Sequence, residues 1–274
     1  MIDKKAEEAF TIGMDAEEAG DFQKAQRSYQ AAVKLDPRAT HARLRLAGLL
    51  FEQSKFKEAI CVARQITKRW PRVSLAHCLI ARSYAELGRW AFAERFYRQA
   101  LAIKQTPAVW VLLADALNHR GQEYEAINCL RKALEVDADF EEAHYNLGVY
   151  FFRFKGKWAL AEKHLRRAIE IDPKYAVAYS ELGQLLLRLK GKKKEAARLL
   201  RKAVDYNPDD PWSRAFLANT LWALRKLKAA KEQYLTLIKR WPEESKHYKW
   251  YADFLLHESG NQTAAKKYLK SAAG

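Results

Sequence analysis

A period of 33 to 35 residues is the feature that most constrains the fold of this chain. An alanine recurs at this interval along the whole sequence, and an apolar residue followed by a small residue precedes each alanine. The alanines are Ala25, Ala59, Ala93, Ala126, Ala161, Ala196, Ala230 and Ala265. A fixed period of this length is typical of proteins built from stacked structural units, in which each unit packs only on its neighbours.

Each unit predicts two amphipathic helices joined by a short turn. The small residues of pairs such as Leu147-Gly148 and Leu182-Gly183 are needed where two helix backbones approach closely. A proline cannot continue a helix and restricts the residue before it. Proline follows the repeated alanine by twelve residues at five of the seven internal boundaries, and at a sixth boundary it is displaced to Pro107. The five regular prolines are Pro37, Pro71, Pro173, Pro208 and Pro242.

In these residues the sequence resembles the tetratricopeptide repeat family, most clearly in EEAHYNLGVYFFRFKGKWALAEKHLRRAIEIDPKY (141–175). The resemblance implies an all-α fold, a right-handed superhelical solenoid of about eight helix-turn-helix repeats. We expect one solenoid over residues 6–274, preceded by a short lead-in of residues 1–5. The expected repeats are 6–39, 40–73, 74–106, 107–140, 141–175, 176–210, 211–244 and 245–274.

Composition and motifs exclude several functional classes. Three cysteines without a CxxC spacing suggest neither a disulfide framework nor a zinc site, and we expect them to pack as small apolar residues. No phosphate-binding loop, nucleophile elbow or HExxH motif occurs. The most apolar stretch, VWVLLADAL (109–117), is too short to span a bilayer. We therefore expect no catalytic residue, no cofactor, no metal site and no membrane insertion, and a cytoplasmic location.

The resemblance also implies where a ligand would bind. In this family the first helix of each repeat lines a concave groove, and its second, fifth, ninth, twelfth and thirteenth positions contact ligands. The groove residues carried over to this chain are Arg82, Asp115, Tyr145, Arg153, Gln184, Arg188, Asn219 and Trp222. The aromatic side chains at these positions have an alternative role, because Phe51, Phe152 and Trp222 could instead pack between neighbouring first helices.

Charge is distributed unevenly along the repeats. The formal net charge is +16, and the eight turns between paired helices carry half of it. Because all these turns lie along one side of a stack of repeats, they predict a basic edge in the second half of the chain. Its members are Lys155, Lys157, Lys190, Lys192, Lys193, Lys194, Arg225, Lys226 and Lys228. Such an edge suits phosphates or an acidic protein segment, or it serves solubility alone.

Three functions are compatible with these patterns. The favoured one is a non-catalytic scaffold or adaptor that holds a peptide or protein segment, with an acidic stretch, in the groove. The first alternative is binding of RNA or single-stranded nucleic acid along the basic edge. The second is a regulatory repeat region of a larger enzyme. The eighth unit ends without a solvating helix, which leaves three alternatives: a partner covers that end, the protein self-associates there, or the sequence is trimmed from a longer chain.

Overall fold

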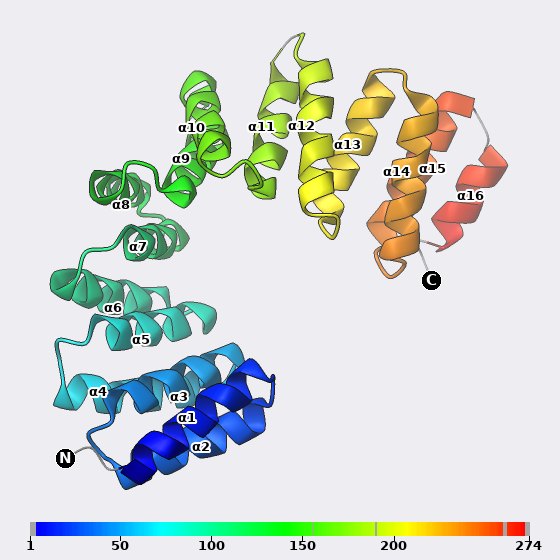
Figure 1. The fold of residues 1–274 in the computed structure, drawn as a ribbon. Coiled ribbons are helices and arrows are strands. Elements are labelled where there is room, and N and C mark those ends of the chain that lie inside the picture. Colours follow the sequence, from blue (N-terminus) through cyan, green and yellow to red (C-terminus); the bar gives the residue numbers. More distant parts are fainter. Residues whose placement is uncertain (1–3, 155, 190, 260–261, 272–274) are drawn as a thin grey trace. The chain divides into compact units, whose positions relative to one another are not determined.

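The computed structural model describes residues 4–154, 156–189, 191–259 and 262–271. These residues form sixteen α-helices and no strand, as the periodicity predicts (Figure 1). The chain separates into two compact units, Met1–Ala138 and Asp139–Gly274, here called unit 1 and unit 2. That the repeats form a single solenoid over 6–274 remains a prediction. We call the odd-numbered helices A helices and the even-numbered helices B helices.

Unit 1 contains four helix pairs. They are α1 (Lys4–Glu18) with α2 (Phe22–Leu35), α3 (Thr40–Glu52) with α4 (Phe56–Arg69), α5 (Ser74–Glu86) with α6 (Trp90–Ile103), and α7 (Pro107–His119) with α8 (Glu123–Val136). Unit 2 contains four more. They are α9 (Glu141–Arg153) with α10 (Trp158–Ile171), α11 (Ala176–Arg188) with α12 (Lys193–Tyr206), α13 (Pro211–Ala223) with α14 (Leu227–Arg240), and α15 (Ser245–Ser259) with α16 (Gln262–Ser271).

The helices begin where the sequence pattern changes. From α3 onward, every A helix starts at the first residue of an expected repeat, whereas α1 already starts at Lys4, inside the expected lead-in. The displaced proline, Pro107, lies in the first turn of α7, where a missing backbone N–H costs nothing. It therefore begins the next helix instead of ending the previous one.

Close approach of the paired helices explains the small residue in each repeat. A Cβ atom added to Gly148 would lie 2.6 Å from Leu165 Cγ, and one added to Gly183 would lie 2.6 Å from Leu200 Cγ. A side chain at either position would therefore push helices A and B apart. The A–B turns impose a second requirement, since one residue there has a positive φ. It is a glycine in five repeats, but Ser54 (φ 58°) and Arg225 (φ 59°) adopt the same conformation.

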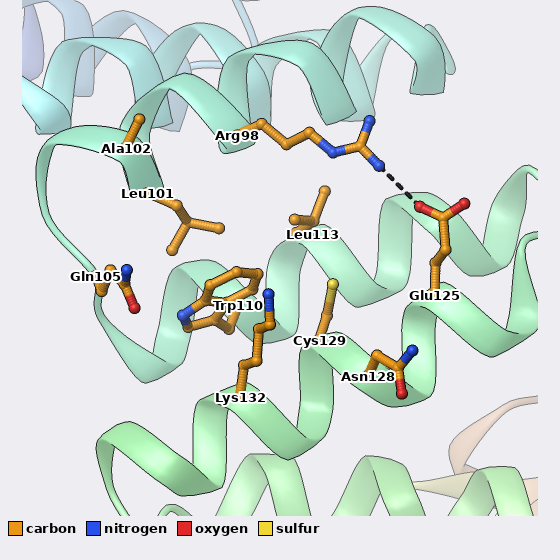
Figure 2. Close-up of a pocket in the computed structure, with 10 residues that line it drawn as sticks. All are labelled: Arg98, Leu101, Ala102, Gln105, Trp110, Leu113, Glu125, Asn128, Cys129 and Lys132. Carbon is orange, nitrogen blue, oxygen red and sulfur yellow. Dashed lines mark hydrogen bonds and ion pairs between the residues drawn. The ribbon is translucent and has the colours of Figure 1, made fainter.

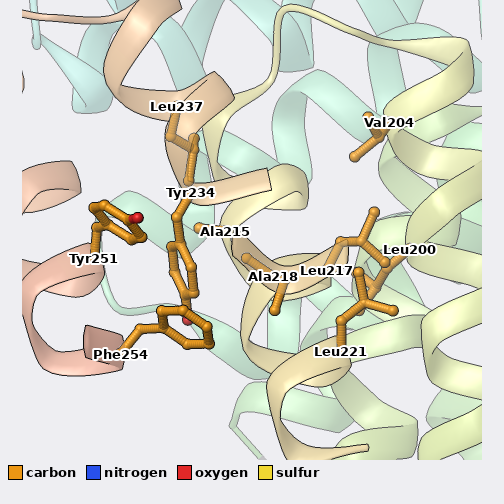
Figure 3. Packing of buried hydrophobic residues seen from close by; sticks show 11 residues of the cluster. Leu200, Val204, Ala215, Leu217, Ala218, Leu221, Tyr234, Leu237, Tyr251 and Phe254 are labelled. Atoms are coloured by element: carbon orange, nitrogen blue, oxygen red, sulfur yellow. The ribbon is translucent and has the colours of Figure 1, made fainter. Parts of the chain in front are cut away.

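Within unit 2, the apolar faces of successive repeats merge into one core. In unit 2 one cluster of buried residues extends over α12, α13, α14 and α15, so three consecutive repeats contribute to it (Figure 3). Tyr234 and Leu237 of α14 are fully buried at its centre, with Tyr251 and Phe254 of α15 packed against Tyr234. This packing shows why one helix pair alone would leave an apolar face exposed.

A polar side chain near the start of several A helices ties the helix to the boundary before it. Each of these side chains bonds to the backbone carbonyl six residues earlier. The bonds join Arg43 to Pro37, His77 to Pro71, Tyr179 to Pro173, Arg214 to Pro208 and His247 to Trp241. Their lengths lie between 2.6 and 3.3 Å. These bonds satisfy carbonyl groups that the preceding chain reversal leaves without helical partners.

Candidate functional site

A pocket of about 380 Å³ opens on the A-helix face of unit 2. It lies over α9, α11 and the beginning of α13, and we call it the Glu181 pocket. Its lining residues are Tyr145, Arg153, Val177, Ser180, Glu181, Gln184, Asp210, Trp212 and Phe216. Three of the residues assigned to the groove from the sequence, Tyr145, Arg153 and Gln184, are therefore brought together at one hollow.

Glu181 is the unusual residue of this pocket. It is only 6% exposed. The guanidinium of Arg153, one A helix earlier, donates to Glu181 Oε1. Glu181 Oε2 is buried and has no hydrogen-bond partner among the described residues. Burial raises the pKa of this carboxyl, and the positive charge of Arg153 opposes that effect. The pocket therefore holds a buried carboxylate of which one oxygen is paired.

Aromatic side chains form much of the pocket wall. The ring of Tyr145 meets Tyr175 edge-on, with 5.5 Å between ring centroids. Burial, together with the charge of Glu181, raises the pKa of Tyr145 to about 12, so its hydroxyl stays protonated at neutral pH. The ring of Trp212 is 51% exposed, and the ammonium of Lys246 lies 4.6 Å from its centroid. These walls offer rigid apolar contact and attract cations.

The second carboxylate at the pocket, Asp210, is already used by the fold. Its oxygens accept hydrogen bonds from the backbone N–H groups of Trp212 and Ser213, each at 3.0 Å, and so cap α13. The buried hydroxyl of Ser213 lies 2.8 Å from that of Ser180 and also bonds to Asp210. Among the described lining residues, Glu181 is therefore the carboxylate that retains an unpaired oxygen.

The other residues assigned to the groove lie elsewhere. In unit 2, Trp222 donates from Nε1 to Glu258 and packs edge-on against Phe254. Its contacts match the alternative role in packing between repeats. Asn219 accepts a hydrogen bond from the buried Tyr234, and Arg188 is exposed.

Two assigned groove residues belong to unit 1. The guanidinium of Arg82 lies 4.3 Å from the ring centroid of Phe51, so Phe51 packs against the next A helix. Asp115 is 3.7 Å from His119 Nε2. These two residues make contacts inside unit 1 and line none of the pockets described here.

The basic edge is partly neutralised inside unit 2. Lys192 forms an ion pair with Glu162 at 3.0 Å, and Arg225 bonds to Glu258 at 2.6 Å. The expected members Lys155 and Lys190 lie outside the described residues. The remaining side chains of the edge are exposed to solvent. They are Lys157, Lys193, Lys194, Lys226 and Lys228.

A four-residue ion-pair network that the sequence analysis missed links consecutive repeats. In unit 1, Glu94 directly follows a repeated alanine and accepts a bond from Arg98, one turn later on the same helix. Glu94 also accepts a bond from Arg120, which follows the next A helix. Arg98 in turn bonds to Glu125. Unit 2 repeats the arrangement with Glu162, Arg166 and Glu195 at matching positions, and Lys192, the residue before α12, supplies the second cation. The available signal was a glutamate directly after the alanine with an arginine four residues later.

A second pocket, of about 450 Å³, lies on the B-helix side of unit 1 between α6, α7 and α8 (Figure 2). Its centre is the indole of Trp110, whose Nε1 is buried without a partner in the described part of the chain. Trp110 stands at the position where other A helices bond to the preceding boundary. The ammonium of Lys132 lies 4.8 Å from the indole centroid. Arg98, at the rim, is held by its ion pair with Glu125.

The described residues contain no group of three or more His, Cys, Asp or Glu side chains arranged for a metal ion. None of their helices is long and apolar enough to cross a membrane. Cys129 is buried and Cys78 half-buried, as expected for packing residues, whereas Cys61 is exposed on α4. The packing interpretation is therefore wrong for Cys61, which falls on the solvent side of its helix.

Models of tetratricopeptide repeats match most of the chain. Four such models cover residues 10–73 and 153–211, 76–108, 114–154, and 189–249. The chain belongs to the tetratricopeptide repeat family. This tetratricopeptide repeat protein also resembles solved structures of low sequence identity. A tetratricopeptide repeat protein from Parabacteroides merdae has 16% identity and a TM-score of 0.67, covering 99% of this chain and 100% of that one.

Two other similar structures have ligand sites in their descriptions. YrrB, described as a TPR protein with an unusual peptide-binding site, has 19% identity and a TM-score of 0.51, with 68% of this chain and 95% of that chain covered. The human IFIT1 dimer with PPP-AAAA has 17% identity and a TM-score of 0.65, with 96% and 67% covered. At these identities the similarity shows a shared fold alone.

Proposed function

We propose that this protein is a non-catalytic scaffold that binds a peptide or protein segment on the A-helix face of unit 2. The observation that carries the proposal is the Glu181 pocket, where side chains from three consecutive A helices converge. The pocket combines exposed aromatic surface with an arginine, a composition typical of binding hot spots, and it adds an unsatisfied carboxylate. A peptide-binding site is also part of the description of the structurally similar YrrB.

The exposed lysines of the basic edge extend this proposal. Lys193 and Lys194 open α12, and Lys226 and Lys228 flank the start of α14. Exposed charges of one sign raise the association rate with an oppositely charged partner more than its final affinity. We therefore propose that the bound segment has acidic residues outside the pocket, and that its association slows as salt increases.

A peptide-display selection on the full chain tests the proposal. Selected peptides are synthesised and their dissociation constants measured by fluorescence anisotropy with the wild type, with Gln184→Trp and with Arg201→Trp. Gln184 borders the pocket, so a tryptophan there obstructs it, whereas Arg201 is exposed on α12 and serves as the matched control. We expect Gln184→Trp to weaken binding about tenfold or more, a loss of at least about 1.4 kcal/mol, and Arg201→Trp to leave it unchanged.

Two results would contradict the proposed binding of a peptide on the A-helix face. Equal peptide affinity for Gln184→Trp and the wild type would exclude the A-helix face as the binding site. A short single-stranded RNA is tested in parallel at low salt. RNA binding that survives Gln184→Trp but is lost in Lys193→Glu/Lys194→Glu would assign the function to the basic edge and nucleic acid instead.

A further inference from the structure

Glu94, Glu162 and Glu181 are three of the carboxylates that accept bonds from arginine side chains among the described residues, and they differ in how many cations reach them. Glu94 is bonded by Arg98 and Arg120. Glu162 is bonded by Arg166 and Lys192. Glu181, which is as deeply buried as Glu94, is bonded by Arg153 on one oxygen and by no described residue on the other. Glu181 therefore lacks the second donor that the other two carboxylates have.

A buried acceptor without a partner carries a desolvation cost that a bound donor removes. As arranged, none of the described residues donates to Glu181 Oε2. The Asp210 carboxylate is itself an acceptor and caps α13, and the Ser180 hydroxyl is paired with that of Ser213. Arg153 already occupies Oε1. The position of a second donor at Glu181 is therefore open to a bound partner.

The pocket around Glu181 is suited to a long basic side chain. Tyr145, Trp212 and Phe216 provide aromatic surface for an aliphatic stem, and aromatic faces attract the cationic end. The protein itself contains an example, since Lys246 lies over the ring of Trp212. Arg153 and Glu181 cancel in charge, and Lys246 over Trp212 offsets Asp210, so the pocket and its edge carry no net charge that would repel a cation.

We propose that the Glu181 pocket binds one lysine or arginine side chain of the partner segment, whose cationic group bonds to Glu181 Oε2. This inference rests on the proposed function and specifies its recognition element. The ligand is then a segment with one basic residue seated in the pocket, and the acidic residues proposed above lie outside it. Binding completes at Glu181 the two-cation arrangement that Glu94 and Glu162 have within the chain.

The test uses the same peptide selection on the full chain, sequenced in depth. We expect lysine or arginine to be enriched at one position of the peptides selected by the wild type, and that enrichment to disappear with Glu181→Gln. Glu232→Gln, which changes an exposed glutamate on α14, is the matched control and keeps the enrichment. Replacing the enriched lysine by norleucine, which keeps the stem and removes the charge, is expected to weaken binding about tenfold, which is about 1.4 kcal/mol.

Several outcomes would overturn the inference. Selected peptides without a preferred basic residue, or a norleucine peptide that binds as well as its lysine parent, exclude a cation in the pocket. Unchanged affinity of the lysine peptide for a Glu181→Gln protein that melts like the wild type excludes Glu181 as its partner. If Gln184→Trp still blocks the peptides in these cases, the proposed function stands while this inference fails. If Gln184→Trp has no effect, both fail.

Discussion

Glu94 in unit 1 and Glu181 in unit 2 are buried to nearly the same degree but are paired differently. Glu94 is 4% exposed and bridges Arg98 on its own helix to Arg120 in the next repeat, so its role is to link repeats. Glu181 lines a pocket and shares one oxygen with Arg153. A carboxylate satisfied within the fold indicates a structural link, whereas one left half-satisfied beside a pocket indicates a place for a ligand.

The largest expected effect is the difference in folding stability when each glutamate becomes glutamine. Glu94→Gln removes the charge that two arginines share, and we expect it to lower the free energy of unfolding by about 2 kcal/mol. Glu181→Gln also removes a buried charge, whose desolvation cost offsets much of its single ion pair. We expect it to change the stability by less than about 1 kcal/mol. Urea unfolding followed by circular dichroism measures both, and equal losses would contradict the comparison.

The next effect comes from giving Glu181 a second cation within the chain. Gln184 lies one turn after Glu181 on the same helix and lines the same pocket, so the arginine in Gln184→Arg can reach the unpaired oxygen. In this variant we expect the Glu181 carboxylate to be paired with two cations, as the Glu94 carboxylate is. We expect the affinity for a lysine-containing peptide to fall about tenfold. Gln184→Met, which adds no charge, is the control in the same anisotropy titration. Equal affinities of the two variants would mean that Glu181 is not the acceptor.

The pH dependence of stability is expected to have opposite signs at Glu181 and Glu162. Burial raises the pKa of Glu181 from 4.5, with Arg153 opposing and Tyr145 and Asp210 as its other titratable neighbours. Glu181 therefore stabilises the fold relative to Glu181→Gln at low pH, and this contribution is lost as pH rises through the raised pKa. At Glu162, burial alone would raise the pKa, but bonds from Arg166 and Lys192 outweigh it and lower the pKa below 4.5.

Glu162 consequently stabilises the fold above pH 4.5, and its contribution is lost as pH falls through the lowered pKa. Urea midpoints of the wild type, Glu181→Gln and Glu162→Gln between about pH 3 and about pH 7 separate the two cases. The difference in urea midpoint between the wild type and each variant should change with pH in opposite directions for Glu181→Gln and Glu162→Gln. Parallel changes for both variants would show that Arg153 satisfies Glu181 as fully as two cations satisfy Glu162.

The sequence predicted the fold because the repeat sets helix position, helix face and turn together. Every A helix after α1 begins at an expected repeat start, and Gly148 and Gly183 stand where paired helices approach closely. Tyr145, Arg153 and Gln184, which the sequence assigned to one face of the A helices, line one pocket, because position within a repeat fixes the face of a helix. Pairing between repeats was not predictable in the same way. The bond of Trp222 to Glu258 joins residues 36 positions apart and depends on side-chain geometry.

Glu181 was missed for a related reason. It directly precedes the apolar–small pair Leu182-Gly183, a position that the expected ligand contacts do not include, and a lone glutamate in that place does not reveal its burial. The signal that identifies it is structural, namely one oxygen paired by Arg153 and one without a partner. Likewise, the positive charge of Lys192 assigned it to a basic edge, but Glu162 of the preceding repeat holds it in an ion pair.

The smallest expected effect concerns whether a second cation is needed for folding. Lys192 supplies that cation at Glu162 and is 38% exposed, and solvent screens such pairs strongly. We therefore expect Lys192→Ala to lower the free energy of unfolding by about 0.5 kcal/mol. Lys193 is exposed and forms no ion pair with a described residue, so Lys193→Ala should leave the free energy of unfolding unchanged. Urea unfolding compares the two. A small loss of unfolding free energy means that the fold tolerates a buried carboxylate paired with one arginine alone. The second cation at Glu181 can then be supplied by a partner. A loss of unfolding free energy above about 2 kcal/mol would mean that the fold depends on the second cation at Glu162. Leaving Glu181 with a single cation would then destabilise the fold, which argues against a vacant second position there.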